Sequence, residues 1–180
     1  MKGKIVLITG ATSGLGKETA RALARLGATI VMTTRDRQRG EQTKQELIAT
    51  TQNKDIDVLY CDLSSFVSIR KFCGEFLQKY DRLHVLINNA GISNFHRRVS
   101  KDGIEETFAV NYLAPFLMTN LLLERLKQSA PSRIINIVSG FHSGTIRFED
   151  LEFTKKYSGF RVYGHSKVAL ILFTRLLAKN

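Results

Sequence analysis

The chain has 180 residues, 43% of them hydrophobic, and a formal net charge of +11 at pH 7. This length suits a single domain over residues 1–180, and the composition excludes a disordered chain or a membrane bundle. The positive charge predicts an anionic partner: nucleic acid, an acidic membrane surface or a phosphorylated cofactor. Nucleic acid is the weakest option, because the basic residues are not interleaved with aromatic residues as a stacking platform requires.

The cysteines and the N-terminal residues bear on metals and on location. Cys61 and Cys73 have no histidine at ligand spacing, so no zinc or other metal site is expected. The first predicted strand begins within a few residues of Met1, which leaves no room for a signal peptide. No apolar run approaches the roughly 20 residues of a membrane span. We expect a cytoplasmic protein with reduced thiols, with peripheral membrane association left open.

The N-terminal segment predicts a strand, a glycine-rich turn, a helix and a second strand. Residues 4–8 are a short apolar run, residues 17–26 have helical periodicity, and residues 29–33 form the next strand. Such a succession is a βαβ unit. The turn between them reads GxxxGxG, with glycines at 10, 14 and 16. Missing side chains there would let a pyrophosphate reach the N-terminus of the helix, so the turn predicts dinucleotide binding.

Charged residues directly follow the second strand, where a dinucleotide site distinguishes its cofactors. A cation there binds the 2′-phosphate of NADP, and an acid binds the ribose hydroxyls of NAD. Arg35 comes first and favours NADP, and Arg39 could reach the same phosphate. Asp36 keeps NAD open as the less favoured cofactor. A solvated charge cluster at the start of the next helix, predicted over residues 41–50, is the alternative without a cofactor.

Two further strands end in polar residues. The strand predicted over residues 55–61 ends at Asp62, which could accept a hydrogen bond from an adenine amino group. Asp62 or Ser64 could instead cap the following helix. The strand over residues 84–87 runs into the sequence NNAG at 88–91. Ligands of open α/β sheets bind at this edge, so these residues are predicted to line the site.

The C-terminal half predicts a long helix from residue 104, a fifth strand over residues 133–138 and a final helix. Pro115 marks either the first turn of a helical segment or a kink that begins near Asn111. The helices over residues 112–128 and 160–179 carry more apolar side chains than one core stripe needs, which predicts a homo-oligomer contact. The final helix carries Tyr163 and Lys167, which share a face at a spacing of four residues.

A tyrosine and a lysine at this spacing have a possible catalytic use. A free phenol has a pKa of about 10, and a fixed cation nearby favours its ionised form. Such a pair can therefore exchange protons at neutral pH. On its own the spacing is more often that of a half-buried tyrosine and a solvated lysine.

Five motifs that occur in one order along the chain favour the catalytic interpretation of this pair. They are TGATSGLG at 9–16, Asp62, NNAG at 88–91, Asn111 with Ser139, and YGHSK at 163–167. As an ordered set spanning the chain, they resemble the short-chain dehydrogenase/reductase family. The sequences RDR at 35–37, LLLERLKQSAPSRI at 121–134 and ILFTRLLA at 171–178 are similar to its retinol-dehydrogenase-like branch.

The resemblance implies a fold, a reaction and a set of site residues. The fold would be an α/β Rossmann-type, doubly wound parallel sheet of about five strands in the order 3-2-1-4-5. The reaction would be hydride transfer between NADP(H) and an alcohol or carbonyl, with a lipophilic substrate. Tyr163 would exchange the proton, Lys167 would favour the phenolate and bind the nicotinamide ribose, Ser139 would hold the substrate oxygen, and Asn111 would hold a water. The implied cofactor-binding residues are Gly10, Ser13, Gly14, Leu15, Gly16, Arg35, Asp62, Leu63, Asn89, Ala90, Gly91, Tyr163 and Lys167.

Some positions depart from the family pattern. Gly140 stands where the family commonly has a second small hydroxyl residue, and Ser13 stands where some NADP-preferring members have a basic residue. A family member would also continue past Asn180 into a sixth strand and a substrate-binding loop. The fifth strand is therefore expected to be an exposed edge, and the final helix to lack one packing face. The alternative function is a truncated, catalytically impaired dinucleotide-binding or interaction module.

Overall fold

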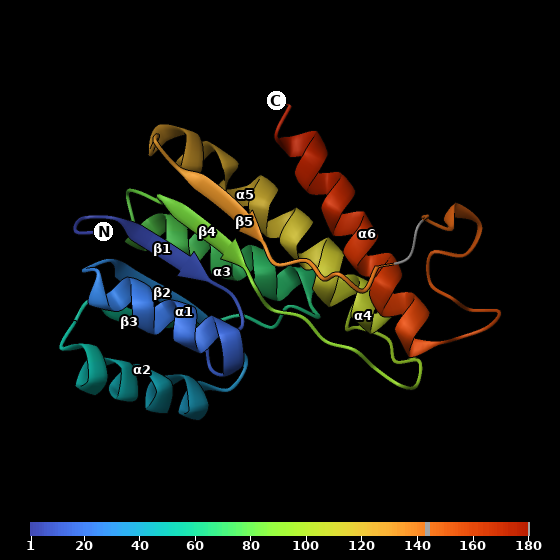
Figure 1. The fold of residues 1–180 in the computed structure, drawn as a ribbon, viewed down its shortest axis with the longest axis horizontal. Coiled ribbons are helices and arrows are strands. Elements are labelled where there is room, and N and C mark those ends of the chain that lie inside the picture. Colours follow the sequence, from blue (N-terminus) through green and yellow to red (C-terminus); the bar gives the residue numbers. More distant parts are fainter. Residues whose placement is uncertain (143–144, 180) are drawn as a thin grey trace.

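A parallel five-stranded sheet forms the centre of the computed structural model, which describes residues 1–142 and 145–179. Its strands are β1 (Ile5–Ile8), β2 (Thr29–Thr34), β3 (Ile56–Tyr60), β4 (Val85–Asn88) and β5 (Arg133–Asn136). They lie in the order β3-β2-β1-β4-β5, which confirms the predicted Rossmann-type sheet (Figure 1). The central strand β1 is apolar throughout because helices cover both faces of the sheet.

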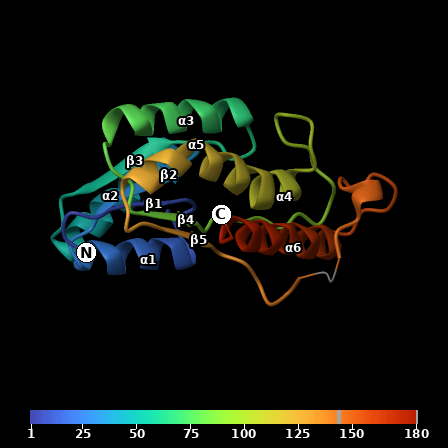
Figure 2. The same ribbon diagram turned by 90° about the horizontal axis from the view of Figure 1, so that it is seen from above.

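Two pairs of helices make the two outer layers. Helices α1 (Gly14–Arg25) and α2 (Arg37–Thr51) pack through Ala20, Ala24 and Leu47 against one face of the sheet. Helices α3 (Phe66–Lys79) and α5 (Ala114–Gln128) cover the other face through a larger cluster that includes Phe72 and Met118. Figure 2 shows α3 and α1 on opposite sides of the strands.

The helix starts differ from the predicted ones because of local caps. Helix α2 begins at residue 37, not 41, since the Asp36 carboxylate accepts the Arg39 N–H at 3.0 Å. Helix α3 begins after Ser65, whose hydroxyl accepts the Ser68 N–H at 3.3 Å. The alternative considered for Asp62 and Ser64, that one of them caps this helix, is therefore wrong.

The helix predicted from residue 104 is interrupted around Asn111. It consists of α4 (Glu106–Phe108), a π-helical segment η1 (Ala109–Leu113) and α5. The Ala114 N–H bonds to the Ala109 carbonyl, five residues earlier, and this widened turn replaces the kink considered above. Pro115 lies in the first turn of α5 and supplies no N–H to the Asn111 carbonyl four residues before it.

The last elements form one side of the molecule. A short 3₁₀ helix, η2 (Phe148–Asp150), precedes α6 (Gly159–Leu177), which packs against α4, η1 and β5. Strand β5 ends at residue 136, two residues earlier than predicted, and among the described residues it pairs with β4 alone. Ile135 and Val138 are exposed by 41% and 42%, as expected of an edge. Within the described residues, no helix is both long and apolar enough to cross a membrane.

Candidate functional site

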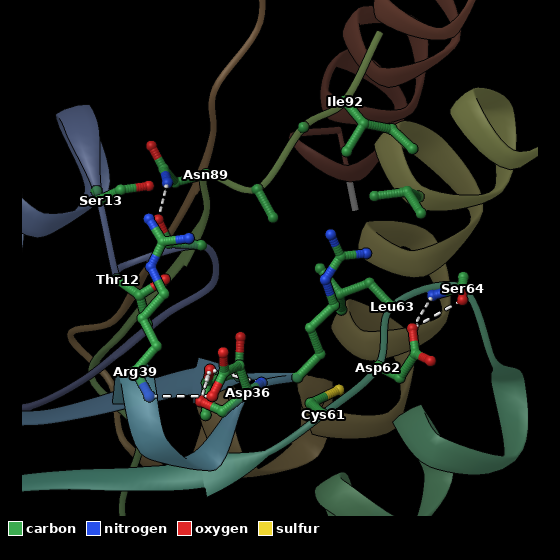
Figure 3. Close-up of a pocket in the computed structure, with 18 of the residues that line it drawn as sticks. Thr12, Ser13, Asp36, Arg39, Cys61, Asp62, Leu63, Ser64, Asn89 and Ile92 are labelled. Atoms are coloured by element: carbon green, nitrogen blue, oxygen red, sulfur yellow. Dashed lines mark hydrogen bonds between the residues drawn. The ribbon is translucent and has the colours of Figure 1, made fainter. Parts of the chain in front are cut away.

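A crevice of about 520 Å³ lies at the carboxyl ends of β1 to β4 (Figure 3). The glycine turn, the ends of β2 and β3 and the NNAG segment line it, so the structure brings together residues that are far apart in the sequence. Its wall includes these predicted cofactor-binding residues: Gly10, Ser13, Leu15, Gly16, Arg35, Asp62, Leu63, Asn89, Ala90 and Gly91. Gly14 begins α1 beside the crevice but is not part of its wall.

The glycine turn is held by the NNAG segment. The Asn89 side-chain amide donates to the carbonyls of Thr9 and Gly10 at 2.9 and 3.1 Å, and the Thr9 hydroxyl accepts the N–H groups of Asn89 and Ala90. Gly10 has φ +66°, and a Cβ on Gly16 would lie 2.4 Å from the Gly10 carbonyl oxygen. No side chain caps α1 at Ser13. The first N–H groups of α1 are thus available to an anion in the crevice.

The charged residues at the end of β2 have different partners. One oxygen of Asp36 caps α2, as described above, and the Thr34 hydroxyl donates to the Asp36 carbonyl at 2.7 Å. Arg35 and Arg39 both line the crevice, and Figure 3 shows the Arg39 side chain pointing into it. Neither guanidinium makes an ion pair or a hydrogen bond with another described residue. Two cations without partners therefore face the crevice, and they can bind a phosphate.

Asp62 is nearly buried and is fixed by two neighbours. One carboxylate oxygen accepts from the Ser64 N–H and hydroxyl at 3.0 and 2.7 Å, and the other lies 2.8 Å from the Lys101 ammonium. Burial raises the pKa of Asp62, but Lys101 and Ser64 lower it by more, and the net shift is downward. The carboxylate is thus an ionised acceptor at the wall of the crevice. Lys101, from the loop before α4, was not identified from the sequence.

The side chain of Asn111 joins three segments. It is fully buried, and its oxygen accepts the Ile92 N–H at 2.8 Å. Its amide donates to the Ile92 carbonyl at 2.9 Å and to the Ser166 hydroxyl on α6 at 3.1 Å. Asn111 therefore fixes the chain after NNAG and the middle of α6 relative to η1.

Tyr163 and Lys167 lie on the face of α6 that is turned toward Gly91. Lys167 is 4% exposed, and its ammonium lies 5.6 Å from the centre of the Tyr163 ring and donates to the Ile137 carbonyl at 2.9 Å. A Cβ on Gly91 would lie 3.5 Å from both the Lys167 nitrogen and the Asn111 oxygen. Burial lowers the pKa of Lys167. The structure thus brings Asn111 and Lys167 together beside Gly91, with Tyr163 next to Lys167. None of the three is part of the wall of the crevice, which they adjoin at Gly91.

Ser139 lies close to this group but is not bonded to it. Its hydroxyl accepts the Phe141 N–H at 3.0 Å, and the Phe141 ring centre is 6.4 Å from that of Tyr163. Among the described residues, no hydrogen bond joins Ser139 to Tyr163 or Lys167. The Ser139 hydroxyl can still donate its own proton to an incoming oxygen.

His165 was not identified from the sequence. It is 1% exposed, stacks on Phe108 at 5.5 Å and meets the edge of Phe153 at 5.2 Å. Its Nε2 accepts the Arg147 N–H at 3.3 Å. Through its hydrogen bond with Arg147, His165 therefore links the segment after Ser139 to α6, the helix that carries Tyr163.

This environment predicts acid sensitivity. Burial is the main reason why the pKa of His165 is lowered, and Arg147 acts in the same direction. The unfolded chain takes up the proton at a pH near 6.5, so stability falls as the pH drops below that value. Burial also lowers the pKa of His84. Between pH 7.5 and 5.5 the free energy of unfolding should therefore fall by about 1 kcal/mol less in His165→Gln than in the wild type.

Urea unfolding at the two pH values measures this difference, with exposed His96→Gln as the control. Equal losses in the wild-type protein and His165→Gln would show that the imidazole does not carry the effect.

Comparisons with known proteins give one consistent result. The sequence profile of the short chain dehydrogenase family matches residues 4–180. Retinol dehydrogenase 12 of Mus musculus is 51% identical over 179 residues, which are 99% of this chain and 57% of that protein. Retinol dehydrogenase 12 of Homo sapiens is 48% identical over 181 residues, again 57% of its length. The chain thus spans little more than half the length of these relatives.

Solved structures agree with the fold. The Pseudomonas aeruginosa RhlG/NADP active-site complex is 30% identical, with a TM-score of 0.79, over 99% of this chain and 67% of that one. A metagenomic short-chain oxidoreductase in complex with NADP is 28% identical, with a TM-score of 0.80, over 99% of this chain and 76% of that one. The fold of the chain is therefore shared with these two proteins.

Proposed function

Because this chain belongs to the short-chain dehydrogenase family, we propose that it is an oxidoreductase that transfers a hydride between NADP(H) and an alcohol or carbonyl. The observation that carries the proposal is that Asn111 and Lys167 meet beside Gly91, a residue of the crevice wall, and that Tyr163 lies next to Lys167. The relatives' names include retinol, and the exposed Phe141 ring beside Tyr163 offers an apolar surface. We therefore propose a lipophilic substrate, as expected from the sequence.

The crevice fits a dinucleotide on structural grounds. Side chains at Gly10 and Gly16 would collide with the NNAG segment or with the turn itself, so both glycines keep the backbone close and the crevice open. The first N–H groups of α1 would hold the pyrophosphate, Asp62 would accept from the adenine amino group, and the NNAG segment would flank the nicotinamide half. The cofactor would supply the hydride donor or acceptor.

The proton chemistry belongs to the chain. In the reductive direction Tyr163 would give its phenolic proton to the developing alkoxide, and in oxidation it would take a proton from the alcohol. The Lys167 ammonium would stabilise the phenolate, since it is buried and has no carboxylate partner among the described residues. The Ser139 hydroxyl would orient the substrate oxygen. Asn111 would hold the water that returns a proton toward Lys167.

We propose NADP rather than NAD because two cations, Arg35 and Arg39, line the crevice without partners, whereas Asp36, which also lines it, has one carboxylate oxygen engaged as a helix cap. A charge-assisted hydrogen bond contributes about 1.5–3 kcal/mol. Arg35→Ala should therefore weaken NADPH binding roughly 10- to 100-fold and change NADH binding less than about twofold. Titrations of the purified chain with both cofactors measure this.

Arg37→Ala is the matched control for that titration, because Arg37 stacks on Tyr60 and does not line the crevice. It should leave both affinities unchanged. Equal losses of NADPH and NADH affinity in Arg35→Ala, or no loss, would count against a 2′-phosphate contact at Arg35.

A specific observation favours a second function, that of a non-catalytic dinucleotide-binding module. The Ser139 hydroxyl accepts from Phe141 and the Lys167 ammonium donates to Ile137, and among the described residues no hydrogen bond joins either group to Tyr163. This module would bind NADPH without turning over a carbonyl. A turnover test with retinal and simple aldehydes, after the NADPH titration, distinguishes the two functions.

Two further expectations remain proposals about the whole protein. The apolar side chains of α5 and α6 include Phe116 and Leu172, which are 42% and 47% exposed, and we propose them as contacts of a homo-oligomer. A cytoplasmic location, with peripheral membrane association as the alternative, also stays a prediction.

A further inference from the structure

A buried carboxyl group lies outside the site described above. Glu105, just before α4, has no exposed surface. One of its oxygens accepts the Phe108 N–H at 2.7 Å and thereby caps the helical segment that carries Asn111. The other oxygen lies 3.3 Å from the Tyr157 hydroxyl. A buried carboxyl group is costly unless each oxygen has a partner, and here both have one.

Tyr157 connects this group to two other segments. Its hydroxyl also lies 2.9 Å from the Asn94 carbonyl, so its single proton has two acceptors within reach. Burial, and then the nearby Glu105 carboxylate, raise the pKa of Tyr157. The phenol therefore stays protonated and acts as a donor at neutral pH.

The segments that meet at this phenol are those that carry the proposed site. Asn94 follows NNAG and lies two residues after Ile92, which is paired with Asn111. Glu105 starts the helical segment of Asn111, and Tyr157 comes six residues before Tyr163. A hydrogen bond at Tyr157 thus joins all three segments near the first turn of α6.

Gly159 lets the first turn of α6 lie close to the chain that follows NNAG. A Cβ on this residue would lie 2.2 Å from the Asn94 carbonyl oxygen and 3.3 Å from the Phe95 Cα. Only a glycine lets the first turn of α6 approach the chain after NNAG to this distance. The junction therefore rests on two independent features, a hydrogen bond at residue 157 and a missing side chain at residue 159.

We infer that Glu105, Tyr157 and Gly159 form a clamp that positions Tyr163 and Lys167 relative to the NNAG segment. The Asn111–Ser166 hydrogen bond holds α6 three residues after Tyr163, and the clamp holds the chain six residues before it. Because both points are fixed, α6 can neither rotate about its axis nor shift along it relative to the NNAG segment. These are positioning residues, and their effect on the reaction rests on the proposed function.

Tyr157→Phe keeps the ring and removes the hydroxyl. Gly159→Ala pushes the same segments apart by its added Cβ, while residue 157 remains a tyrosine. Small misplacements of catalytic groups can reduce rates up to about 100-fold. We expect each variant to slow single-turnover hydride transfer, measured per bound NADPH, by at least about tenfold, with the NADPH dissociation constant changed less than about twofold. Tyr112→Phe is the control, because its hydroxyl makes no hydrogen bond within the described chain.

The rate per bound NADPH separates positioning from mere stability. A structural role alone would lower the fraction of chains that bind NADPH but leave this rate constant unchanged. Rates within twofold of the wild type in Tyr157→Phe would overturn the inference, as would equal slowing in Tyr112→Phe.

A second readout does not depend on turnover. Amide hydrogen exchange of the NADPH complex should be at least about tenfold faster at residues 160–167 in Tyr157→Phe, and unchanged over α3. If the wild-type chain turns over no carbonyl, the proposed function fails and this readout alone decides the clamp. Unchanged exchange at residues 160–167 would then overturn it.

Discussion

Tyr163→Phe should lower the rate of carbonyl reduction by about 10²- to 10⁴-fold while NADPH binding stays within about twofold of the wild type. The phenolic proton is the one that the proposed reaction transfers, and phenylalanine keeps the ring beside Phe141. The buried Lys167 ammonium, 5.6 Å from the ring centre, would then have no phenolate to stabilise. Single-turnover rates and NADPH titrations measure both quantities.

Tyr60→Phe serves as the control for this substitution, since Tyr60 lies on β3 and contacts Arg37. It should leave the rate unchanged. Turnover that survives in Tyr163→Phe would remove the proton-transfer role from Tyr163. A loss of NADPH binding in the same variant would instead point to a role in the cofactor site.

Gly16→Ala should abolish measurable cofactor binding and destabilise the fold. Its Cβ would lie 2.4 Å from both the Asn89 amide nitrogen and the Gly10 carbonyl oxygen, which have no room to retreat because they are bonded to each other. Overpacking of this kind costs about 1–3 kcal/mol. Displacement of the glycine turn would also disturb the N–H groups that would hold the pyrophosphate. Urea unfolding and NADPH titration give the two effects.

Gly74→Ala is the matched control, because Gly74 is an exposed position in α3 with nothing within 4 Å of its added Cβ. The Gly74→Ala substitution should stabilise the protein by up to about 1 kcal/mol, because alanine favours a helix more than glycine does. If Gly16→Ala also leaves stability and NADPH affinity intact, the turn does not cradle the cofactor in the way proposed.

The fold could be predicted because its signals are local and repeated. Apolar runs such as residues 4–8 favour a buried strand, and strands separated by helices are expected to run parallel. The order of the strands was expected from the family resemblance. The glycine turn and the NNAG segment were placed at the crevice for the same reason: each directly follows a strand, and strand ends of a parallel sheet share one edge.

Other features depend on contacts between distant segments, which a pattern cannot show. The partners of Asp62 include Lys101, which is 39 positions away in the sequence and meets it only in the folded chain. His165 has an ordinary helical neighbourhood in the sequence, and its burial depends on Phe108 and Phe153. The π-helical turn at Asn111 was read as a possible kink because Pro115 is visible while a five-residue hydrogen bond is not.

The cap of α3 shows a smaller limit. Asp62, Ser64 and Ser65 are all good capping residues within four positions, so propensity alone could not choose among them. Asp62 is instead held by Ser64 and Lys101, and Ser65 is left to accept from Ser68. The structure thereby leaves Asp62 at the crevice, where the resemblance had placed it for a different reason.

The central claim is that the chain of residues 1–180 binds NADPH in the crevice and passes its hydride to a carbonyl with Tyr163 as the acid. The most direct measurement is a single-turnover experiment in which the pre-bound NADPH complex is mixed with retinal. We expect the reduced-nicotinamide absorbance to disappear and one equivalent of retinol to form in the wild type, and neither change to occur in Tyr163→Phe. Tight NADPH binding with no alcohol formed from retinal or from simple aldehydes would contradict it.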